Sequence, residues 1–482
     1  MGVPRYVVLV MSLFAAHSLA KTCTVRPLGH GRSDVSQIEA AIAECGQHGT
    51  TVIEAGEYNI TRKMQWNLAN SHVDLHGKLN FVFDLAYWMD PANTFQVIFI
   101  QSQSSWFVIT GHDFAIDAHG TGGILGNGQH WWSWYGNGTR LDGDGRPVAL
   151  SLSNVTRGTV RGFVVDAPPF WCNAVADSRD VLYDGMHCNA TNADPTYFGQ
   201  NIVWNTDGID TFRSENITLR DFDITSGDDC LAIKGNSTRI LAQNVTCRGG
   251  TGIAFGSVGQ YADLPDYVSD VVLEDVTFVR PDPQIQPLME HGVYFKSWTG
   301  TRIGFPPTGG GAGGGRVSGV VVRNVKLDEV TTPIQLYQTN LGHPGDAASK
   351  LQFANLTFEH WSGTAQNATI VDLQCSSAAP CADLTFEDID IAAPAGEDAA
   401  YNCVHVASAT GLPAGACVAP ARAIRCPGPG SANSATHITP SSRPPPPPSL
   451  PPFFFLLPFR TSCPLLQAGP FCAGRRLRSC PD

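Results

Sequence analysis

The stretch ITLRDFDI, residues 217–224, shows the pattern that decides the fold. Apolar residues occupy its first, third, sixth and eighth places. Alternate places lie on one face of a strand, and the extra residue between the third and sixth places turns the chain to begin another strand. These eight residues therefore predict two short strands joined by a bend, each with one apolar face.

The same window recurs along the chain, with starts 36, 23, 31, 49, 31 and 33 residues apart, and Asn or Asp often precedes or fills its turn. Its instances are Val181, Tyr183, Met186, Cys188; Ile217, Leu219, Phe222, Ile224; Ile240, Ala242, Val245, Cys247; Val271, Leu273, Val276, Phe278; Val320, Val322, Val325, Leu327; Leu351, Phe353, Leu356, Phe358; and Leu384, Phe386, Ile389, Ile391. A unit that returns to one orientation without helices between is best stacked as a parallel β-helix. A sandwich or propeller would require tight hairpin turns, which are scarce between the windows.

The composition agrees with an all-β protein. The chain has 482 residues and a hydrophobic content of 43%, which is ample for a core. Charged residues at 15% and 49 glycines indicate many turns and few solvated helical faces. The net charge of −12 argues against a binder of nucleic acid or anionic membranes, because such proteins need a basic surface.

The two ends of the chain differ from the repeats. Residues 1–20 have an early arginine, an apolar run over 6–16 and a small-residue site, which predict a secretory signal peptide. Residues 426–482 form a Pro-rich tail that cannot continue the repeats and is expected to be disordered. We expect one β-helix domain over 21–425, with a short N-terminal capping helix that buries Ile38, Ala41 and Ile42.

Fourteen cysteines and nine glycosylation sequons indicate an oxidising, secretory route, so we expect a secreted, extracellular protein. The sequons are at Asn59, Asn137, Asn154, Asn189, Asn216, Asn236, Asn244, Asn355 and Asn367. No cysteine or histidine spacing resembles a zinc site, so the cysteines are expected in disulfides. We expect Cys172 to pair with Cys188.

A cluster of carboxylates lies in the motifs NTDGID, SGDDC and GGTGIAFGSVG between Asn205 and Gly259. Asp207 precedes Asp228 and Asp229 by about one coil, so stacking would place all three on one face, roughly 4.8 Å apart from coil to coil. Cleavage of a glycosidic bond needs such carboxylates, one to protonate the leaving oxygen and another to activate water. An isolated Asp-Gly pair more often marks only a turn, but the ordered set favours catalysis.

In this order, the motifs resemble glycoside hydrolase family 28, the polygalacturonases and their relatives that cut pectin. The resemblance covers residues 23–391 and implies a right-handed parallel β-helix and inverting hydrolysis, with acid and base carboxyls roughly 6.5 to 9.5 Å apart. It implies that Asp228 is the general acid, with a pKa raised by neighbouring negative charge. Asp207 and Asp229 would activate water, and Asn205 would orient the cluster. It also implies the disulfides Cys23–Cys45, Cys230–Cys247 and Cys375–Cys381.

The chain departs from the family pattern at substrate-binding positions. Thr251 stands where many polygalacturonases have histidine, and Tyr294 stands where they have arginine, although Lys296 is retained. A tyrosine cannot grip a carboxylate with the two hydrogen bonds of an arginine. We nevertheless expect Asn205, Thr251, Tyr294, Lys296 and the aromatic platform Trp298 to contact substrate. The tyrosine that often follows the family's PI...Q segment is missing, with Asn340 nearby instead.

Other candidates have two interpretations. The aromatic residues Trp131, Trp132, Trp134 and Tyr135 could stack on sugar rings or fill gaps between loops and core, and the sequence favours neither. An acidic substrate needs local basic groups, for which Lys234 and Lys296 are candidates, whereas Arg213 and Arg248 are expected to be surface charges.

The sequence therefore predicts a secreted hydrolase of pectic polysaccharide, most simply an exo-acting α-1,4-galacturonidase. The alternatives are an exo-rhamnogalacturonan hydrolase, an endo-polygalacturonase, or a non-catalytic wall-binding protein. We expect no metal and no organic cofactor, no nucleic acid or membrane partner, and a monomer.

Overall fold

The computed structural model describes residues 21–136, 145–306, 309–340, 342–414 and 416–417. The expected signal peptide, the sequon at Asn137 and the Pro-rich tail lie outside these residues. The described residues belong to one compact unit, Met1–Ala423, which consists mostly of parallel strands. Each turn of the chain adds a coil to a right-handed parallel β-helix, because crossovers between parallel strands are right-handed. The expected all-β fold is confirmed.

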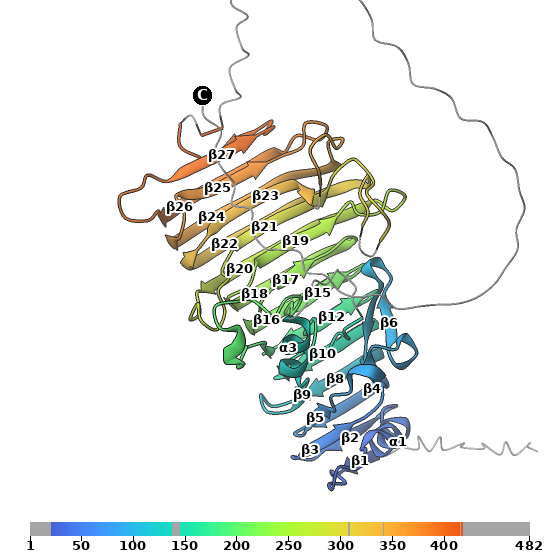
Figure 1. The fold of residues 1–482 in the computed structure, drawn as a ribbon. Helices are drawn as coiled ribbons and strands as arrows, with labels where there is room; N and C mark the ends of the chain where they lie inside the picture. The colour runs from blue at the N-terminus through green and yellow to red at the C-terminus, as the bar shows by residue number, and fades with distance from the viewer. Residues whose placement is uncertain (1–20, 137–144, 307–308, 341, 415, 418–482) are drawn as a thin grey trace, which may run out of the picture. The chain divides into compact units, whose positions relative to one another are not determined.

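The strands stack in three columns, and the longer strands bend so that they contribute to two of them (Figure 1). The first column, which we call the site column, contains the N-terminal parts of β4, β8 and β10, and then β12 (Asn173–Ala176), β15 (Ile209–Phe212), β17 (Asp229–Ile233), β19 (Gly252–Val258), β21 (His291–Trp298), β23 (Thr332–Asn340), β25 (Thr369–Gln374) and β27 (Ala400–Val404).

The second, or middle, column contains β1 (Lys21–Val25), β2 (Gly49–Ile53), β4 (Met64–Leu75), β8 (Phe107–Asp117), β10 (Leu150–Arg161), β13 (Arg179–Asp184), β16 (Glu215–Thr225), β18 (Ser237–Arg248), β20 (Asp266–Val279), β22 (Gly314–Val330), β24 (Lys350–Ala365), β26 (Ala382–Ala392) and β28 (Ala409–Thr410). The third column contains β3 (Glu57–Ile60), β5 (Lys78–Phe81), β9 (Gly123–Leu125), β11 (Val164–Asp166), β14 (His187–Asn189) and the C-terminal parts of β16, β18, β20, β22, β24 and β26.

The bends that separate the columns recur at equivalent residues. Asp180, Asn216, Arg239, Asp270, Gly319, Asn355 and Asp383 share one register and have positive φ, as do Asp221, Asn244, Asp275, Asn324, His360 and Asp388. Asn and Asp tolerate this left-handed conformation better than other residues with a side chain. The turn chemistry expected from the repeated window is therefore confirmed.

The repeated windows face the core, with one error of register. The side chains of the window that starts at Ile217 are buried and pair in register with those at Ile240, Val271 and Val320. The window placed at Leu351 is wrong by five residues, because Val320 pairs with Leu356. Leu351 and Phe353 are buried in the preceding part of β24, which the alternation alone cannot distinguish from the next strand.

Helices lie between or before the coils. They are α1 (Val35–Cys45), α2 (Leu85–Trp88), α3 (Gly128–Gly136) and the 3₁₀ turns η1 (Pro91–Asn93), η2 (Ile100–Ser102) and η3 (Pro195–Tyr197). The expected capping helix is α1, whose Ile38, Ala41 and Ile42 side chains are buried against the first coils. Among the described residues, no helix is long and apolar enough to cross a membrane.

The four expected disulfides are present, namely Cys23–Cys45, Cys172–Cys188, Cys230–Cys247 and Cys375–Cys381. The structure adds Cys403–Cys417, which the sequence analysis did not identify. Of the described sequons, Asn59 and Asn189 are half-buried, and the other six asparagines are exposed.

Candidate active site

Neighbouring coils of the site column bring the three aspartates together. Asp207 lies two residues before β15, whereas one coil later Asp228 directly precedes β17 and Asp229 is the first residue of β17. The backbone ladder fixes this placement, because Gly208 N donates to Asp229 O at 3.0 Å and Cys172 N donates to Asp207 O at 2.7 Å. One oxygen of each carboxylate lies within 4.8 Å of an oxygen of the others.

The separation of acid and base carboxyls decides the stereochemical outcome, and roughly 6.5 to 9.5 Å is typical of inverting glycosidases. In this cluster one oxygen of each carboxyl lies no more than 4.8 Å from one oxygen of the others. This limit applies to single oxygens and does not give the separation of whole carboxyls. Inversion therefore stays a prediction from the family resemblance.

Two glycines let the backbone of the next coil approach the cluster. Gly250 has φ 76° and Gly252 has φ 98°, which favour glycine. A Cβ atom on Gly250 would lie 2.2 Å from Asp228 O, and one on Gly252 would lie 2.2 Å from His291 O. The GGTG sequence is thus required for the coil that follows the aspartates.

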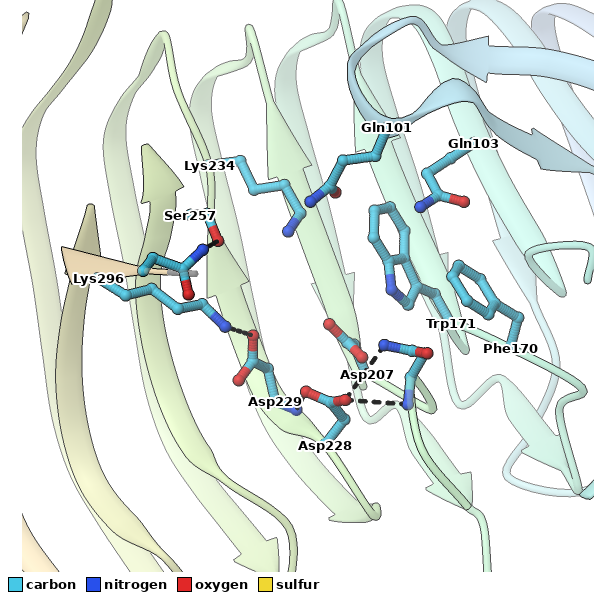
Figure 2. Close-up of a pocket in the computed structure, with 12 residues that line it drawn as sticks. Gln101, Gln103, Phe170, Trp171, Asp207, Asp228, Asp229, Lys234, Ser257 and Lys296 are labelled. Atoms are coloured by element: carbon cyan, nitrogen blue, oxygen red, sulfur yellow. Dashed lines mark hydrogen bonds and ion pairs between the residues drawn. The ribbon is translucent and has the colours of Figure 1, made fainter. Parts of the chain in front are cut away.

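Asp228, which is labelled in Figure 2, is the most exposed of the three aspartates. It is held by Asn205. The backbone N and Nδ2 of Asn205 both donate to Asp228 Oδ2, at 3.0 and 3.2 Å. Arg146, which is buried, donates from Nη2 to Asn205 Oδ1 at 3.1 Å and packs 3.9 Å from the ring centre of Tyr135. Arg146 therefore fixes the orientation of the amide that holds Asp228.

Asp229 is buried among donors from two later coils. It accepts hydrogen bonds from Thr251 Oγ1 at 2.6 Å, from the Tyr294 hydroxyl, and from Lys296 Nζ at 3.1 Å. Burial and the Asp229 carboxylate raise the pKa of Tyr294 well above its usual value, so the phenol stays neutral and donates. Burial alone would lower the pKa of Lys296, but Asp229 raises it well above the usual range.

Asp207 is buried beside other carboxylates. Burial, followed by repulsion from Asp210, Asp228 and Asp229, raises its pKa well above the usual value. Its Oδ1 is buried and has no hydrogen-bond partner among the described residues, although the residue lines a cavity. The unliganded cluster therefore retains a proton above the pH at which an isolated carboxyl would lose it.

A second buried ion pair lies beside Asp207. Lys234 Nζ is 3.0 Å from Asp210 Oδ1, with angles that are poor for a hydrogen bond, and both side chains are almost fully buried. Burial raises the pKa of Asp210 to about 7 even though Lys234 opposes this shift. Lys234 Nζ also lies 4.8 Å from the ring centre of Trp171.

A cavity of about 150 Å³ lies above these residues (Figure 2). It is lined by Gln101, Gln103, Phe170, Trp171, Asn205, Asp207, Asp228, Asp229, Lys234, Ser257, Lys296 and Asn340. Gln101 and Gln103 come from the antiparallel hairpin of β6 (Phe95–Ile98) and β7 (Gln103–Ser105). Figure 2 shows Gln101 and Lys234 on the side of the cavity opposite Asp228.

The hairpin is attached to the site column by aromatic and polar contacts. The Tyr261 hydroxyl accepts a hydrogen bond from Gln101 N at 2.9 Å. The Phe99 ring lies 5.5 Å from that of Phe212 and 6.0 Å from that of Tyr261, and the Arg213 guanidinium lies 4.9 Å from Phe99. These contacts hold the hairpin over one side of the cavity.

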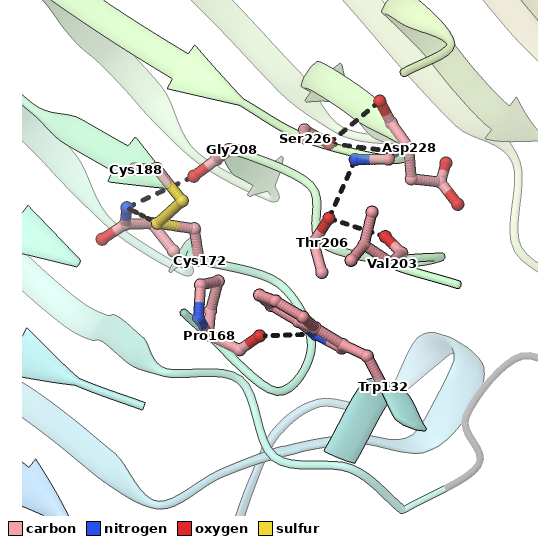
Figure 3. The surroundings of a disulfide bond; sticks show 11 residues. Trp132, Pro168, Cys172, Cys188, Val203, Thr206, Gly208, Ser226 and Asp228 are labelled. Carbon is pink, nitrogen blue, oxygen red and sulfur yellow. Dashed lines mark hydrogen bonds between the residues drawn. A yellow bond between two sulfur atoms is a disulfide. The ribbon is translucent and has the colours of Figure 1, made fainter. Parts of the chain in front are cut away.

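The Cys172–Cys188 disulfide supports the backbone beneath the aspartates (Figure 3). Asn173, next to Cys172, donates from Nδ2 to Gly208 O at 3.2 Å. Thr206 Oγ1 accepts from Gly227 N at 3.0 Å, and Ser226 Oγ accepts from Asp228 N at 2.9 Å. Short side-chain hydrogen bonds thus tie the turn before β15 to the turn before β17.

Three of the residues expected to contact substrate are buried. Thr251 and Tyr294 bind Asp229 and are not among the residues that line the cavity. Trp298 is only 2% exposed, so its use as a sugar platform stays a prediction. A tyrosine does accompany the PI...Q segment, because Tyr337 precedes Gln338 and lies 6.4 Å from the Tyr294 ring.

The aromatic cluster on α3 packs inward. Trp131, Trp132 and Tyr135 are buried, and Trp132 donates to Pro168 O at 3.1 Å, so the packing interpretation is correct for them. Trp134 is half-buried. The expected surface positions of Arg213 and Arg248 are confirmed, since they pair with Asp177 and Asp223.

The sequence analysis did not identify Arg146, Asp210, Trp171 or the glutamines of the hairpin as residues of the site. No motif marks them, because the coils bring them in from as far away as residue 101. The three carboxylates also offer oxygen ligands for a cation. However, the Lys296 ammonium already occupies one side of Asp229 and opposes a second positive charge there.

Comparisons with known proteins agree with this geometry. The family model described as glycosyl hydrolases family 28 matches residues 67–412. A protein of Aspergillus niger that carries the name galacturan 1,4-alpha-galacturonidase A is 40% identical over 432 residues, which cover 84% of this chain and 96% of the relative. The alpha-L-rhamnosidase rgxB of Aspergillus niger is 31% identical, over 77% of this chain and 83% of the relative.

Solved structures share the fold. An endo-xylogalacturonan hydrolase from Aspergillus tubingensis has a TM-score of 0.66 at 20% identity, and the match covers 81% of this chain and 99% of that one. An exopolygalacturonase from Thermotoga maritima has a TM-score of 0.57 at 15% identity, over 77% of this chain and 88% of that one. At these identities the likeness concerns the fold alone.

Proposed function

Because this chain belongs to glycosyl hydrolases family 28, we propose that it hydrolyses pectin by removing single galacturonic acid residues from the non-reducing ends of α-1,4-linked galacturonan. The observation that carries the proposal is the cavity itself. Three carboxylates lie at its base, two lysines line it, and a hairpin covers one side. The galacturonidase name of the relative at 40% identity supports this substrate.

In this proposal Asp228 is the general acid. It is the most exposed carboxyl of the cluster, and Asn205 fixes one of its oxygens. Asp207 and Asp229 hold the attacking water, with the unpartnered Oδ1 of Asp207 as one acceptor. Burial and repulsion from the neighbouring carboxylates raise the pKa of Asp207, so the cluster keeps a proton close to Asp228.

The hairpin accounts for exo action. A polymer that passed through the cavity would have to cross the segment that contains Gln101 and Gln103, which Tyr261 and Phe212 hold in place. A chain end meets no such obstacle, because it needs only one sugar-sized space. The expected product is therefore a monomer at every turnover.

The two lysines of the cavity favour the binding of an acidic sugar. Lys234 and Lys296 both line the cavity and stay protonated, so they supply positive charge in a chain whose net charge is −12. Each is a point charge and does not grip a carboxylate with two bonds as arginine does. The carboxylate of galacturonate would therefore be held by charge more than by a bidentate hydrogen bond.

A rhamnogalacturonan substrate is the second candidate. One observation favours it: Thr251 and Tyr294, which occupy the positions where many polygalacturonases bind the substrate, are used to hold Asp229. A relative at 31% identity carries the name alpha-L-rhamnosidase, which agrees with a substrate that contains rhamnose. We also propose an extracellular location, which the five disulfides and exposed sequons support.

The experiment is a comparison of purified wild-type protein and Asp228→Asn on polygalacturonate and on rhamnogalacturonan at mildly acid pH. We expect galacturonic acid from polygalacturonate with the wild type only. Products from rhamnogalacturonan alone would select the second candidate. Absence of cleavage of both polymers by wild type would favour a wall-binding protein. Proton NMR of the first-formed anomer tests inversion, and a retained configuration would contradict the roles given to Asp207 and Asp229.

A further inference from the structure

A cluster of two histidines and an aspartate lies outside the cavity, on the first coils. Asp74 is near the end of β4, His76 follows that strand, and His119 follows β8, one coil later. Asp74 pairs in register with Asp117, so His76 and His119 occupy equivalent places on adjacent coils. Their rings are stacked 4.3 Å apart with an interplanar angle of 1°.

The two imidazoles point their ε nitrogens at one oxygen. His76 Nε2 lies 3.1 Å from Asp74 Oδ1, and His119 Nε2 lies 2.5 Å from the same atom. Ligand atoms around a tetrahedral zinc ion, with bonds of about 2.0 to 2.2 Å, are roughly 3.3 Å apart. Three ligand atoms of the types that zinc prefers lie within 4.8 Å of one another. Because the two rings are parallel and both contacts to Asp74 are shorter than roughly 3.3 Å, the side chains must move apart and one ring must rotate when an ion enters.

The charges around the cluster favour a cation. Asp74 and Asp117 are carboxylates on adjacent coils, and within the part of the chain that the structure describes neither pairs with a lysine or arginine. Arg161, the next residue in the same register, lies 3.9 Å from Asp184 instead. Only the histidines offset the repulsion between the two aspartates.

The second nitrogen of His119 faces a carboxylate that can orient the ring for zinc binding through Nε2. His119 Nδ1 lies 3.4 Å from Asp117 Oδ1. A neutral imidazole has one N–H, so it can donate from Nδ1 to a carboxylate while Nε2 binds a metal. This carboxylate–histidine–metal arrangement is usual in zinc sites, where it fixes the ring and the tautomer.

Simple hydrogen bonds between exposed histidines and aspartates also occur in this chain. His112 Nδ1 lies 2.8 Å from Asp113, and His360 Nε2 lies 3.4 Å from Asp388. Each of these pairs has a single histidine. The first coils differ because two ε nitrogens meet one carboxylate oxygen and a further carboxylate orients the second ring.

We propose that Asp74, His76 and His119 bind one Zn²⁺ ion, with Asp117 orienting His119. The ligands come from two coils, so the ion fastens β4 to β8 and stabilises the N-terminal coils of the solenoid. Local sequence spacing did not predict the site, because Asp74 and His119 are 45 residues apart in sequence. The site is independent of the proposed hydrolase activity.

The test is titration of untagged, full-length, chelator-treated protein with Zn²⁺ at pH 7.5, followed by calorimetry and by the shift in Tm. Wild type should bind one ion and gain Tm with added Zn²⁺, whereas Mg²⁺ should produce neither effect. His76→Ala and His119→Ala should weaken binding at least 10-fold, and Asp117→Asn about 10-fold. The control His360→Ala removes an exposed histidine of a single pair and should bind as wild type does.

A second readout covers variants that fold poorly. Co²⁺ added to wild type should give the strong visible absorption of a four-coordinate site, and His119→Ala should not. The proposal is overturned if wild type shows no saturable binding, or if His76→Ala and His119→Ala bind Zn²⁺ as tightly as His360→Ala.

Discussion

The site column and the middle column both contain ion pairs between basic and acidic side chains, but those of the middle column are exposed and those of the site column are buried. In the middle column, Arg220 pairs with Asp184 and Arg323 with Glu274, and both arginines are almost half exposed. In the site column, Lys234 pairs with Asp210 and Lys296 with Asp229, and all four side chains are buried or nearly so. Exposed pairs contribute little to stability, whereas the buried pairs carry a desolvation cost.

This difference indicates which face of a β-helix carries the functional residues. Every coil repeats the same strands and bends, so the backbone alone does not distinguish one face from another. Charge that is buried on one column does distinguish it, because an elongated fold could easily leave such groups in water. Four predictions test this contrast, beginning with the largest effect.

The first prediction concerns Asp228→Asn. We expect kcat to fall about 10³-fold, because the variant cannot donate the proton to the leaving oxygen. Thermal unfolding should change little, since the amide can still accept from Asn205. The matched control is Asp184→Asn in the middle column, which should keep full activity. Near-normal turnover by Asp228→Asn would remove it from the acid role.

The second prediction concerns Lys234→Met. The change leaves the Asp210 carboxyl buried without its cation, and we expect a loss of about 3 kcal/mol in unfolding free energy at pH 8. The loss should be smaller at pH 5, because the raised pKa of Asp210, about 7 with lysine present, leaves this carboxyl protonated there. Urea unfolding at the two pH values measures both. Equal losses at pH 5 and pH 8 would contradict the buried ion pair.

The third prediction concerns pH and Asp266, which accepts from Gly259 N at 2.7 Å beside the site. Burial raises its pKa to about 6. Its ionisation is therefore easier in the unfolded chain, and stability from the neutral form is lost as pH rises from about 4 to 6. Relative to Asp266→Asn, wild type should lose about 2 kcal/mol of unfolding free energy over that range.

Asp184 provides a comparison for the same measurement, because the pH dependence of its contribution to stability has the opposite sign. Arg220 lowers the pKa of Asp184, so its contribution is present above the unfolded pKa and is lost as pH falls. Relative to Asp184→Asn, wild type should therefore gain stability as pH rises. Slopes of the same sign for the two aspartates would contradict the contrast between buried and exposed carboxylates.

The fourth prediction is the smallest. Arg220→Met removes an exposed partner of Asp184, and we expect a change below about 1 kcal/mol in unfolding free energy, reduced further by salt. Activity should be unchanged. A loss as large as that of Lys234→Met would show that burial does not separate the two columns.

The fold could be predicted from the sequence because each repeat is determined by residues that are close together in the chain. Apolar alternation and left-handed Asn or Asp at the bends are both encoded within eight residues, so ITLRDFDI predicts its own coil. The error at Leu351 arose where an extra apolar pair precedes the bend, and only pairing with β22 fixes the register.

The sequence was less informative about the site because alternation does not say which polar side chains meet. Asp207, Asp228 and Asp229 were found because their motifs lie one coil apart. Tyr294 was expected at the substrate and instead binds Asp229, since the register of β19 and β21 points it at the carboxylate. The hairpin that contributes Gln101 and Gln103 has no repeat pattern, so its place over the cavity could not be predicted.

The most direct test of the proposed function is a time course on a galacturonate hexamer labelled at its reducing end. The hairpin over the cavity predicts unlabelled monomer from the first time point, with the label moving to the pentamer and then the tetramer. Labelled trimer or dimer appearing before the pentamer would show internal cleavage, and would contradict the role given to the hairpin.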